Sequence, residues 1–471
     1  MVNSKSLLIA FSMAMIISGL VLVSTSNFST VRASTDVMGI ISSDTNWTKA
    51  KSPYNLVGNV LVNQSVTLTI EPGVTVNLGD YYIMINGTLR AIGTSVNPIQ
   101  FNGGEITLTS FSNGWNNETD SGFIIEHANT NGTPISSSNS SKAVNNTFGA
   151  AFSTTGSSLV SNNAFSEGID VTGFSKLLEN TITGGVSVGG TSTATNNSIT
   201  GEVTTSGSSV VSNNTIFGSV SAGGSSIVSN NSITNTAYTG FGLSCSGYAS
   251  AFNNTISGWD TGVVIGSEFF GEGGYPSIEN NWIIDNNCGI GVSVFIRNWV
   301  GTNIPTIQYN IISYNNVAVR LSVTLQETYG TRPPTQICNN TISYNAVGLN
   351  LTGSVNYCTI IYNNIQNNSN YNLYLATSTN LNATYNWWGT TNTTAISQSI
   401  YDYYEDFNLG IVTYVPFLSE TNAFAPLLPP DFVIPELPQG LLMVLIMLPL
   451  VAGVMLVRKK LLKPQNKILP Y

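Results

Sequence analysis

A single asparagine recurs at a fixed interval through the middle of the chain, and this repeat limits the possible folds more than any other feature. The interval is 17 residues, and it is kept at Asn146, Asn163, Asn180, Asn197, Asn214 and Asn231. An interval this regular is typical of proteins built from one stacked structural unit. The residues around each Asn alternate between polar and apolar, and they include too many Gly and Ser for a helix. The repeat therefore predicts short strands joined by turns.

An apolar residue stands two positions after each of these asparagines: Phe148, Phe165, Ile182, Ile199, Ile216 and Ile233. Because side chains alternate along a strand, the Asn and the apolar residue are expected to face the same side, toward a core. A buried Asn is costly unless it is hydrogen-bonded, and stacked Asn side chains can bond from one unit to the next. We expect these six asparagines to form a structural ladder with no catalytic role.

The same signature continues in longer units, at Asn254, Asn281, Asn310, Asn340, Asn364 and Asn386. One strand-and-turn unit cannot bury its apolar side alone, whereas units stacked about 4.8 Å apart bury a continuous column. The sequence therefore predicts a β-solenoid.

The Asn-x-Ile units at residues 145–390 resemble the repeat of pectin-lyase-like and NosD-like β-helix proteins. Residues 67–76 and 87–94 are similar to the opening coils of secreted β-helix proteins, and Tyr385–Gly389 is similar to a last coil. The resemblance implies an all-β fold, a right-handed parallel β-helix. It alone supplies the handedness, because a 17-residue interval also suits a left-handed coil. The implied parts are opening coils at 34–144, followed by repeats and a cap at 145–421.

The amino-terminal residues have the pattern of a secretory signal peptide. Lys5 precedes an apolar stretch at 7–23, and Val31-Arg32-Ala33 forms a cleavage site of small residues. We expect residues 1–33 to be removed on export. An uncleaved amino-terminal anchor is the alternative, because the apolar stretch is long for a signal. Both interpretations place the rest of the chain outside the cell.

An apolar stretch near the carboxyl terminus predicts a single-pass membrane anchor. Residues 440–457 carry no charge and, with their neighbours, are long enough to cross a bilayer. Basic residues follow them, which favours a cytoplasmic carboxyl terminus. A buried core helix is the alternative. The expected segments are a Pro-rich linker at 422–438, a transmembrane helix at 439–457 and a cationic tail at 458–471.

Residues Ile434–Pro438 resemble the Pro-Glu-Phe-Pro sorting signal of archaeal surface proteins, with Leu437 in place of Phe. In such proteins a sortase-like enzyme can remove the helix. Because of the departure at Leu437, a retained helix is our first expectation.

The composition limits the classes of molecule that the chain is expected to bind. Only 8% of the residues are charged and the net charge is −9, so the chain lacks the basic surface that nucleic-acid binding requires. Hydrophobic residues make up 42%, enough to bury a core. The expected partners are the cell membrane, through the anchor, together with envelope or foreign glycans or surface-layer proteins.

No metal or cofactor is predicted. His127 is the only histidine, which excludes a site with several His ligands from one chain. The glycines recur with the repeat and form no phosphate-binding loop. The four cysteines lie far apart, so two disulfides and four unpaired buried thiols both remain open: Cys245, Cys288, Cys338 and Cys358.

No catalytic residue is assigned. Uronate lyases on the resembled fold use clustered Asp with a Lys or Arg base, and glycosidases use two spaced carboxylates. The best group of such residues here lies in the longer units: Asp260, Glu268, Glu272, Asp285 and Arg297. We expect a non-catalytic surface, adhesive or carbohydrate-binding module; an extracellular polysaccharide lyase, hydrolase or epimerase is the alternative. Aromatic residues that suit sugar stacking, or plain packing, are Trp282, Trp299, Tyr309, Tyr314, Tyr344 and Tyr362.

The N-glycosylation motif Asn-x-Ser/Thr occurs just before many anchor positions, at Asn145, Asn196, Asn213, Asn230, Asn253 and Asn339. Alternation along a strand is expected to turn these side chains outward, in one stripe about 4.8 Å apart per coil. That spacing is too close for every site to carry a glycan, so partial occupancy is expected. The alternative is that Asn-Asn-Thr is turn chemistry and the motif is an accident.

Overall fold

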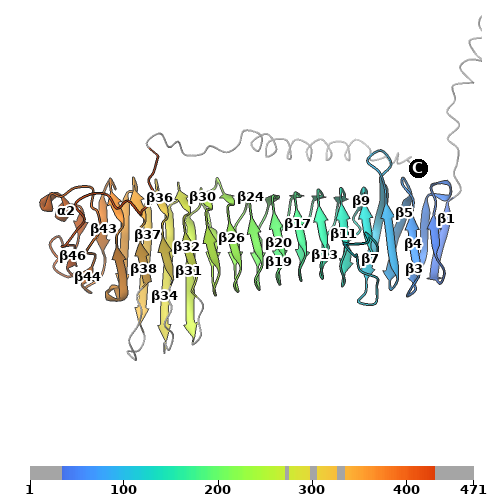
Figure 1. The fold of residues 1–471 in the computed structure, drawn as a ribbon, viewed down its shortest axis with the longest axis horizontal. Coiled ribbons are helices and arrows are strands. Elements are labelled where there is room, and N and C mark those ends of the chain that lie inside the picture. Colours follow the sequence, from blue (N-terminus) through green and yellow to red (C-terminus); the bar gives the residue numbers. More distant parts are fainter. Residues whose placement is uncertain (1–33, 271–274, 298–304, 326–334, 430–471) are drawn as a thin grey trace, which may run out of the picture. The chain divides into compact units, whose positions relative to one another are not determined.

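The computed structural model describes residues 34–270, 275–297, 305–325 and 335–429 (Figure 1). Within them the chain is all-β with parallel strand pairing, apart from helix α2 (Thr393–Gln398) and the 3-10 turns η1 (Lys49–Lys51) and η2 (Val355–Tyr357). The chain divides into two compact units. The first consists of Met1–Thr234, Gly242–Asn254 and Gly274–Ser277, and the second of Asn235–Phe241, Thr255–Gly273 and Ile278–Tyr471.

In the first unit each of the regular coils after β7 contributes one short strand to each of three faces. One coil runs through β17 (Lys176–Leu178), β18 (Thr181–Ile182) and β19 (Val186–Val188). Each of these strands pairs in parallel with the equivalent strand of the coil before and the coil after. This is the arrangement of a parallel β-helix, as the repeat predicts. The right-handed sense stays a prediction.

The strands of the first unit fall into three columns. The first face holds β9 (Ala128–Asn131), β12 (Thr147–Phe148), β15 (Ala164–Phe165), β18, β21 (Ser198–Thr200), β24 (Thr215–Phe217) and β27 (Ser232–Thr234). The second face holds β10 (Ile135–Ser137), β13 (Phe152–Thr154), β16 (Ile169–Val171), β19, β22 (Val203–Thr205), β25 (Val220–Ala222) and β28 (Phe241–Cys245). The third face holds β2 (Thr45–Trp47), β4 (Thr67–Ile70), β6 (Thr88–Ile92), β8 (Ile124–Glu126), β11 (Lys142–Val144), β14 (Leu159–Ser161), β17, β20 (Thr193–Thr195), β23 (Val210–Ser212), β26 (Ile227–Ser229) and β29 (Ser250–Phe252).

The opening coils use longer strands: β1 (Thr35–Ile41), β3 (Tyr54–Val62), β5 (Thr75–Ile85) and β7 (Ile99–Leu108). The first part of β7 pairs with β9 and its last part with β10. One long strand therefore corresponds to two strands of the later coils.

The second unit repeats the three-faced plan. Its first face holds β30 (Thr255–Ser257), β33 (Trp282–Ile284), β36 (Ile311–Ser313), β39 (Thr341–Ser343) and β42 (Asn364–Gln366). Its second face holds β31 (Thr261–Phe270), β34 (Cys288–Arg297), β37 (Val317–Leu325), β40 (Val347–Gly353), β43 (Tyr371–Leu375) and β45 (Ile400–Tyr401). Its third face holds β32 (Ser277–Glu279), β35 (Thr306–Gln308), β38 (Thr335–Cys338) and β41 (Cys358–Ile361), and β44 (Leu381–Asn382) pairs with β46 (Val412–Thr413).

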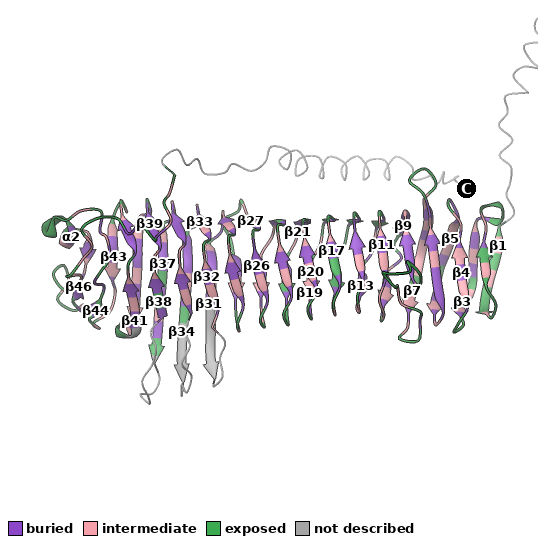
Figure 2. Ribbon diagram, viewed as in Figure 1, coloured by how far each residue is buried: buried purple, intermediate pink, exposed green. Residues whose placement is uncertain are grey.

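Alternation along each short strand builds the core. In the coil of β17 to β19 the side chains of Leu177, Ile182, Val186 and Val188 are at most 2% exposed, and Figure 2 shows the same alternation in the other coils. Phe148 and Phe165 stack inside the first unit with ring centroids 4.7 Å apart. Burying one such apolar side chain contributes about 1.5–3 kcal/mol, so the repeated column holds the coils together.

The anchor asparagines of the first unit form a hydrogen-bonded column. Asn197, for example, donates to Oδ1 of Asn214 from its backbone N–H at 2.8 Å and from Nδ2 at 3.0 Å. The Nδ2 of Asn197 also donates to the carbonyl of Leu177 at 3.0 Å. The same contacts join the other members, and the column continues from Asn231 to Asn254. The column members are at most 3% exposed, and their polar groups are satisfied inside the core.

The second unit contains two such columns. The first consists of Asn281, Asn310, Asn340, Asn363 and Asn386, and the second of Asn286, Asn315, Asn345 and Asn368. The anchor expected at Asn364 lies one residue earlier, at Asn363, so the sequence-based prediction was wrong by one residue. Asn363 occupies the column because it stands two residues before the inward Ile365, as the other anchors do. The second column was not expected.

The residue before each anchor is a corner and not part of a strand. Asn145, Asn196, Asn213, Asn230 and Asn253 have φ between 56° and 57°. This left-handed backbone turns the chain from the third face to the first, and Asn tolerates it better than most residues. The expected cause of their exposure, alternation along a strand, is therefore wrong, although all five side chains are exposed.

The last described residues form a strap over the second unit. The strap, residues 418–429, runs along the outward side of the first face. The N–H of Leu418 donates to Asn386 O, that of Asn422 donates to Asn364 Oδ1 at 2.8 Å, and Thr341 Oγ1 donates to Pro426 O. The first part of the predicted linker is thus packed against the β-helix.

The predicted signal peptide at 1–33, the transmembrane helix at 439–457 and the tail at 458–471 lie outside the described residues. Within the described ranges, no helix combines the length and hydrophobicity needed to cross a bilayer. All four cysteines are free thiols; Cys245, Cys288 and Cys358 are buried and Cys338 is partly exposed.

Candidate functional site

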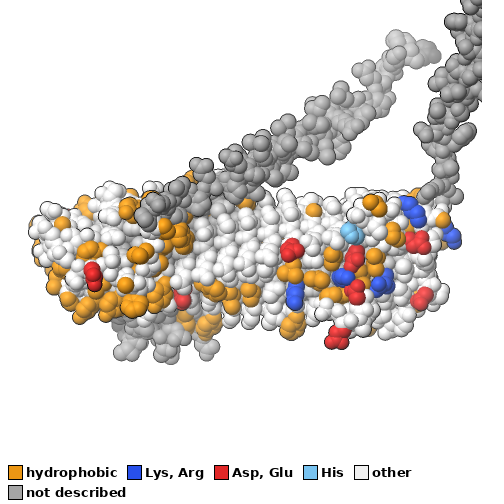
Figure 3. All heavy atoms as spheres, turned by 45° about the horizontal axis from the view of Figure 1, so that its top comes forward, with side chains coloured by type: hydrophobic (Ala, Val, Ile, Leu, Met, Phe, Trp, Pro, Cys, Tyr) orange, Lys and Arg blue, Asp and Glu red, His pale blue; other side chains and the backbone are white. Residues whose placement is uncertain are grey.

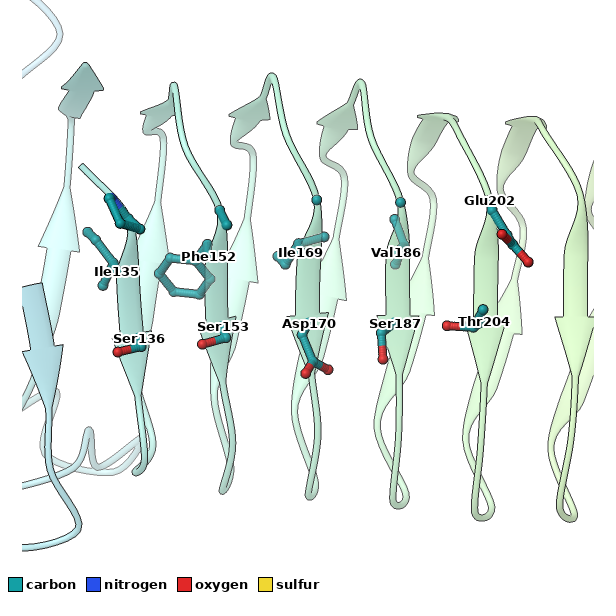
Figure 4. Close-up of a pocket in the computed structure, with 14 residues that line it drawn as sticks. Ile135, Ser136, Phe152, Ser153, Ile169, Asp170, Val186, Ser187, Glu202 and Thr204 are labelled. Atoms are coloured by element: carbon teal, nitrogen blue, oxygen red, sulfur yellow. The ribbon is translucent and has the colours of Figure 1, made fainter. Parts of the chain in front are cut away.

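A groove of about 550 Å³ runs across the outward side of the second face of the first unit. It crosses five successive coils, from β10 through β13, β16 and β19 to β22 (Figure 4). The strands beneath it pair in register without a bulge. The groove is therefore straight and follows the stacking direction of the coils.

One position of the repeat supplies a row of polar side chains along this groove. The row consists of Ser136, Ser153, Asp170, Ser187 and Thr204, which are register partners on neighbouring strands. Figure 4 shows them side by side, each on the central part of its strand. Because neighbouring strands lie about 4.8 Å apart, the groove offers a similar polar group at each step.

Small residues at the start of the strands leave the groove open. Ala151, Gly168 and Gly185 occupy equivalent positions on three successive coils, and Pro134 and Glu202 occupy the same position at the two ends. A Cβ on Gly185 would meet nothing closer than Glu202 O at 3.7 Å. This space is open because side chains are missing, and the backbone does not require Gly there.

Two carboxylates line the groove, from Asp170 and Glu202, and no Lys, Arg or His is among its lining residues. Both side chains are exposed, and Oε1 of Glu202 accepts a hydrogen bond from Ser221 Oγ at 3.2 Å. Their Cα atoms are two strands and two residues apart, roughly 12 Å from standard sheet spacings. Neither residue belonged to the candidate site expected from the sequence.

The structure divides the residues of the best enzyme candidate between the two ends of β31 and β34. Asp260 and Asp285 lie at the corner before β31, whereas the backbones of Glu268 and Arg297 lie near the far ends of these paired strands. In the second unit Asp260 Oδ1 accepts from Asn287 Nδ2 at 2.8 Å, and Asp285 Oδ2 accepts from Tyr238 OH at 2.8 Å. Arg297 ends β34, nine residues after Cys288, which is the register partner of Thr261. A strand rises about 3.3 Å per residue, so the backbone at Arg297 lies roughly 30 Å from this corner. Glu272 lies outside the described residues, and of Glu268 only the backbone is described.

The four tyrosines proposed for sugar stacking occupy corners of the second unit. Tyr314 and Tyr344 stack with ring centroids 5.6 Å apart, and Tyr362 packs at 6.0 Å against Tyr385. Tyr309, Tyr314, Tyr344 and Tyr362 all have left-handed backbones, as the corner asparagines have. Trp282 is half-buried on β33, and Trp299 lies outside the described residues. The four tyrosines therefore belong to two separate corner columns, one with Tyr314 and Tyr344 and the other with Tyr309 and Tyr362.

Charged side chains gather on one part of the first unit (Figure 3). Lys142 Nζ contacts Asp120 Oδ1 at 3.0 Å and Glu126 Oε1 at 2.8 Å, and Trp115 Nε1 donates to the same Asp120 oxygen at 3.0 Å. Burial opposes the charge on Lys142, but its bonds to Glu126 and Asp120 outweigh burial and raise the pKa of the amine. A protonated, paired lysine is unsuited to act as a general base. Through its ion pair with Asp120, Lys142 holds the loop after β7 against the third face.

The possible glycosylation sites differ in access. Asn145, Asn196, Asn213, Asn230 and Asn253 are exposed on the first unit. Asn339, in the second unit, is half-buried beside the strap, and its Oδ1 accepts from Asn422 Nδ2 at 2.9 Å. Asn339 is therefore already engaged in the fold.

Comparison with known proteins adds little to this geometry. No protein-family model and no curated protein sequence matches the chain. Two solved chains match in structure, one of them a mannuronic acid-specific polysaccharide family 6 lyase from human gut microbiota. That match has 10% sequence identity and a TM-score of 0.31 over 71% of this chain and 85% of the lyase chain. A likeness this weak says nothing about activity.

Proposed function

We propose that the chain is a non-catalytic β-helix of the cell surface that binds an extended polysaccharide along the groove of its first unit. The observation that supports this most directly is the polar row of Ser136, Ser153, Asp170, Ser187 and Thr204. A surface that repeats at every coil matches a ligand that repeats along its own length. Hydroxyl and carboxylate groups bind sugar hydroxyls by hydrogen bonds, and an open groove accepts a polymer without needing its ends.

The rest of the proposal follows from the sequence. The chain would be exported by the signal at 1–33 and held by a helix at 439–457, so that a right-handed β-helix stands outside the membrane. The Ser- and Thr-rich surface and low charge of the coils suit an adhesive module among envelope glycans or surface-layer proteins.

Affinity electrophoresis of the full-length protein through gels that contain single polysaccharides tests this function. The variant Ser187→Phe places a bulky side chain in the middle of the groove, and Thr193→Phe places the same side chain on the third face as a matched control. We expect at least one polymer to retard the native protein and the Thr193→Phe variant but not Ser187→Phe. If one polymer retards all three proteins equally, the polysaccharide binds at a surface other than the groove. If no polymer retards the native protein, the proposed function is wrong.

A polysaccharide-cleaving enzyme is the second candidate, because Asp170 and Glu202 line one groove. Glycosidases use two carboxylates that flank the bond to be cleaved. Incubation of the native protein with every polymer that retards it, followed by assays for new reducing ends and for unsaturated products, separates the two functions. Cleavage that is lost in Glu202→Gln would favour the enzyme.

A further inference from the structure

The charge of the groove indicates which polysaccharides it accepts, and this inference rests on the proposed function. The lining residues include two carboxylates and no basic side chain. Lys142 is held by Asp120 and Glu126, and both it and Lys176 belong to the third face. Asp170 therefore places a negative charge in the groove that no basic lining residue balances, and Glu202, whose Oε1 accepts from Ser221 Oγ on the next coil, places a second at its end.

We propose that the groove selects polymers of amino sugars whose amines are protonated, and disfavours uronic-acid polymers. An ammonium group beside Asp170 or Glu202 forms a charge-assisted hydrogen bond, which is stronger than a bond between neutral groups. A uronate carboxylate in the same place faces like charge and has no cation to pair with. The neutral members of the row, Ser153, Ser187 and Thr204, remain available to the sugar hydroxyls.

The positions of the two carboxylates suit this ligand. Asp170 is on β16 and Glu202 precedes β22, two coils further on. Two coils span about 9.6 Å along the stack, and the offset of two residues along the strand brings the Cα separation to roughly 12 Å. Amines on separate sugars of one extended chain can therefore meet the two carboxylates, with Ser187 on the coil between them.

The small residues at the edge of the groove leave room for such a chain. Gly168 and Gly185 lie between Ala151 and Glu202 in the same repeat position, so the sugar next to Glu202 meets backbone and not a side chain. This space is specific to these coils, because the equivalent position before β10 is Pro134.

The test measures binding of three hexamers to the full-length protein by isothermal titration calorimetry. They are β-1,4-linked glucosamine, the same oligomer fully N-acetylated, and a galacturonic acid hexamer, at about pH 5.5 where carboxylates are ionised. The variants are Asp170→Asn and Glu202→Gln, singly and together. The control is Glu118→Gln, which removes an exposed carboxylate from the loop after β7.

We expect the glucosamine hexamer to bind most tightly, with affinity that falls as salt is raised. The double variant should bind the glucosamine hexamer roughly tenfold more weakly or worse, a loss of about 1.4 kcal/mol or more in binding free energy. The affinity of the Glu118→Gln variant should equal that of the native protein. If the N-acetylated hexamer binds equally well and the double variant binds as the native protein does, the charge inference fails and the proposed function stands. Tighter binding of the uronate hexamer would overturn the inference, and no binding of any hexamer would count against both. Thermal unfolding of each variant confirms that loss of binding is not loss of fold.

Discussion

At the scale of single residues, Asn214 carries several interactions of the buried column at once. Its Oδ1 accepts from the backbone and the Nδ2 of Asn197, and its own Nδ2 donates to Asn231 Oδ1 and Ala194 O. Asn214→Leu would remove the side-chain partner of the Asn197 backbone N–H and of the Ala194 carbonyl in the core, whereas Asn231 Oδ1 keeps its bond from the backbone N–H of residue 214. We expect it to lower the free energy of unfolding by roughly 1–3 kcal/mol, measured by urea unfolding. Thr215→Val, an exposed neighbour, is the control; equal midpoints for the two variants would mean that the column contributes nothing.

The cysteines give a prediction about alkaline pH. Burial raises the pKa of the Cys245 and Cys358 thiols to about 12, from the ordinary value of 9.0. Above pH 9 the unfolded chain loses these protons while the folded chain keeps them, so the contribution of the two thiols to stability is constant below that pH and falls as pH rises toward 12. Each thiol adds a slope of up to about 1.4 kcal/mol per pH unit. Cys245→Ala should flatten the decline between pH 9 and 11, and a decline identical to the native one would show that the thiol does not contribute.

At the scale of elements, the backbone conformation of each turn decides whether its glycine is required. Gly190 has φ +68°, and a Cβ there would lie 2.7 Å from Gly173 O, whereas Gly185 in the same coil has space for one. Gly190→Ala should cost about 1–3 kcal/mol through backbone strain, and Gly185→Ala should change stability little or raise it by up to about 1 kcal/mol. Thermal unfolding of the pair checks this, and equal losses would mean that the corner tolerates a side chain.

The corner asparagines give a second prediction at this scale. We expect partial N-glycosylation along the column of Asn145, Asn196, Asn213, Asn230 and Asn253, because neighbouring coils are too close for a glycan on each. Asn339 should carry none, since Asn422 holds its side chain. Glycopeptide mass spectrometry of the native protein measures both. A bare column would mean that Asn serves only the left-handed corner, and a glycan on Asn339 would mean that the strap forms after modification.

The repeat predicts the elements better than it predicts the site. The anchor interval locates Asn197 and Ile199 in the core, because a side chain in a parallel stack must meet its equivalent in the next coil. Alternation predicts a strand residue at Asn196, where the structure has a corner, because a single left-handed residue leaves no period of its own in the sequence. The groove was missed although Ser136, Ser153 and Ser187 keep the same interval. An outward polar row looks like ordinary surface until the small residues beside it are seen to leave a hollow.

The second column of the second unit was hidden for a related reason. Asn286, Asn315 and Asn345 follow the first column by five residues in each coil, but the coils differ in length and the pairs do not recur at one interval. Longer strands such as β31 and β34 account for that length, and their ends cannot be located from periodicity alone. The strands of coils with a constant length can thus be predicted from the sequence, whereas those of coils with long strands can be predicted only in part.

At the scale of the whole molecule, function depends on which side of a membrane the groove faces. Residues 1–33 and 439–457 predict a chain exported by a signal and anchored once, with Lys and Arg after residue 457 holding the tail in the cytoplasm. Protease added to intact cells should then remove the β-helix and spare a tag placed after Tyr471, detected by immunoblot. Lysed cells, in which the same protease reaches the tag, are the control. Loss of the tag from intact cells would place the carboxyl terminus outside, and a β-helix protected in intact cells but digested after lysis would place the groove out of reach of any extracellular polymer.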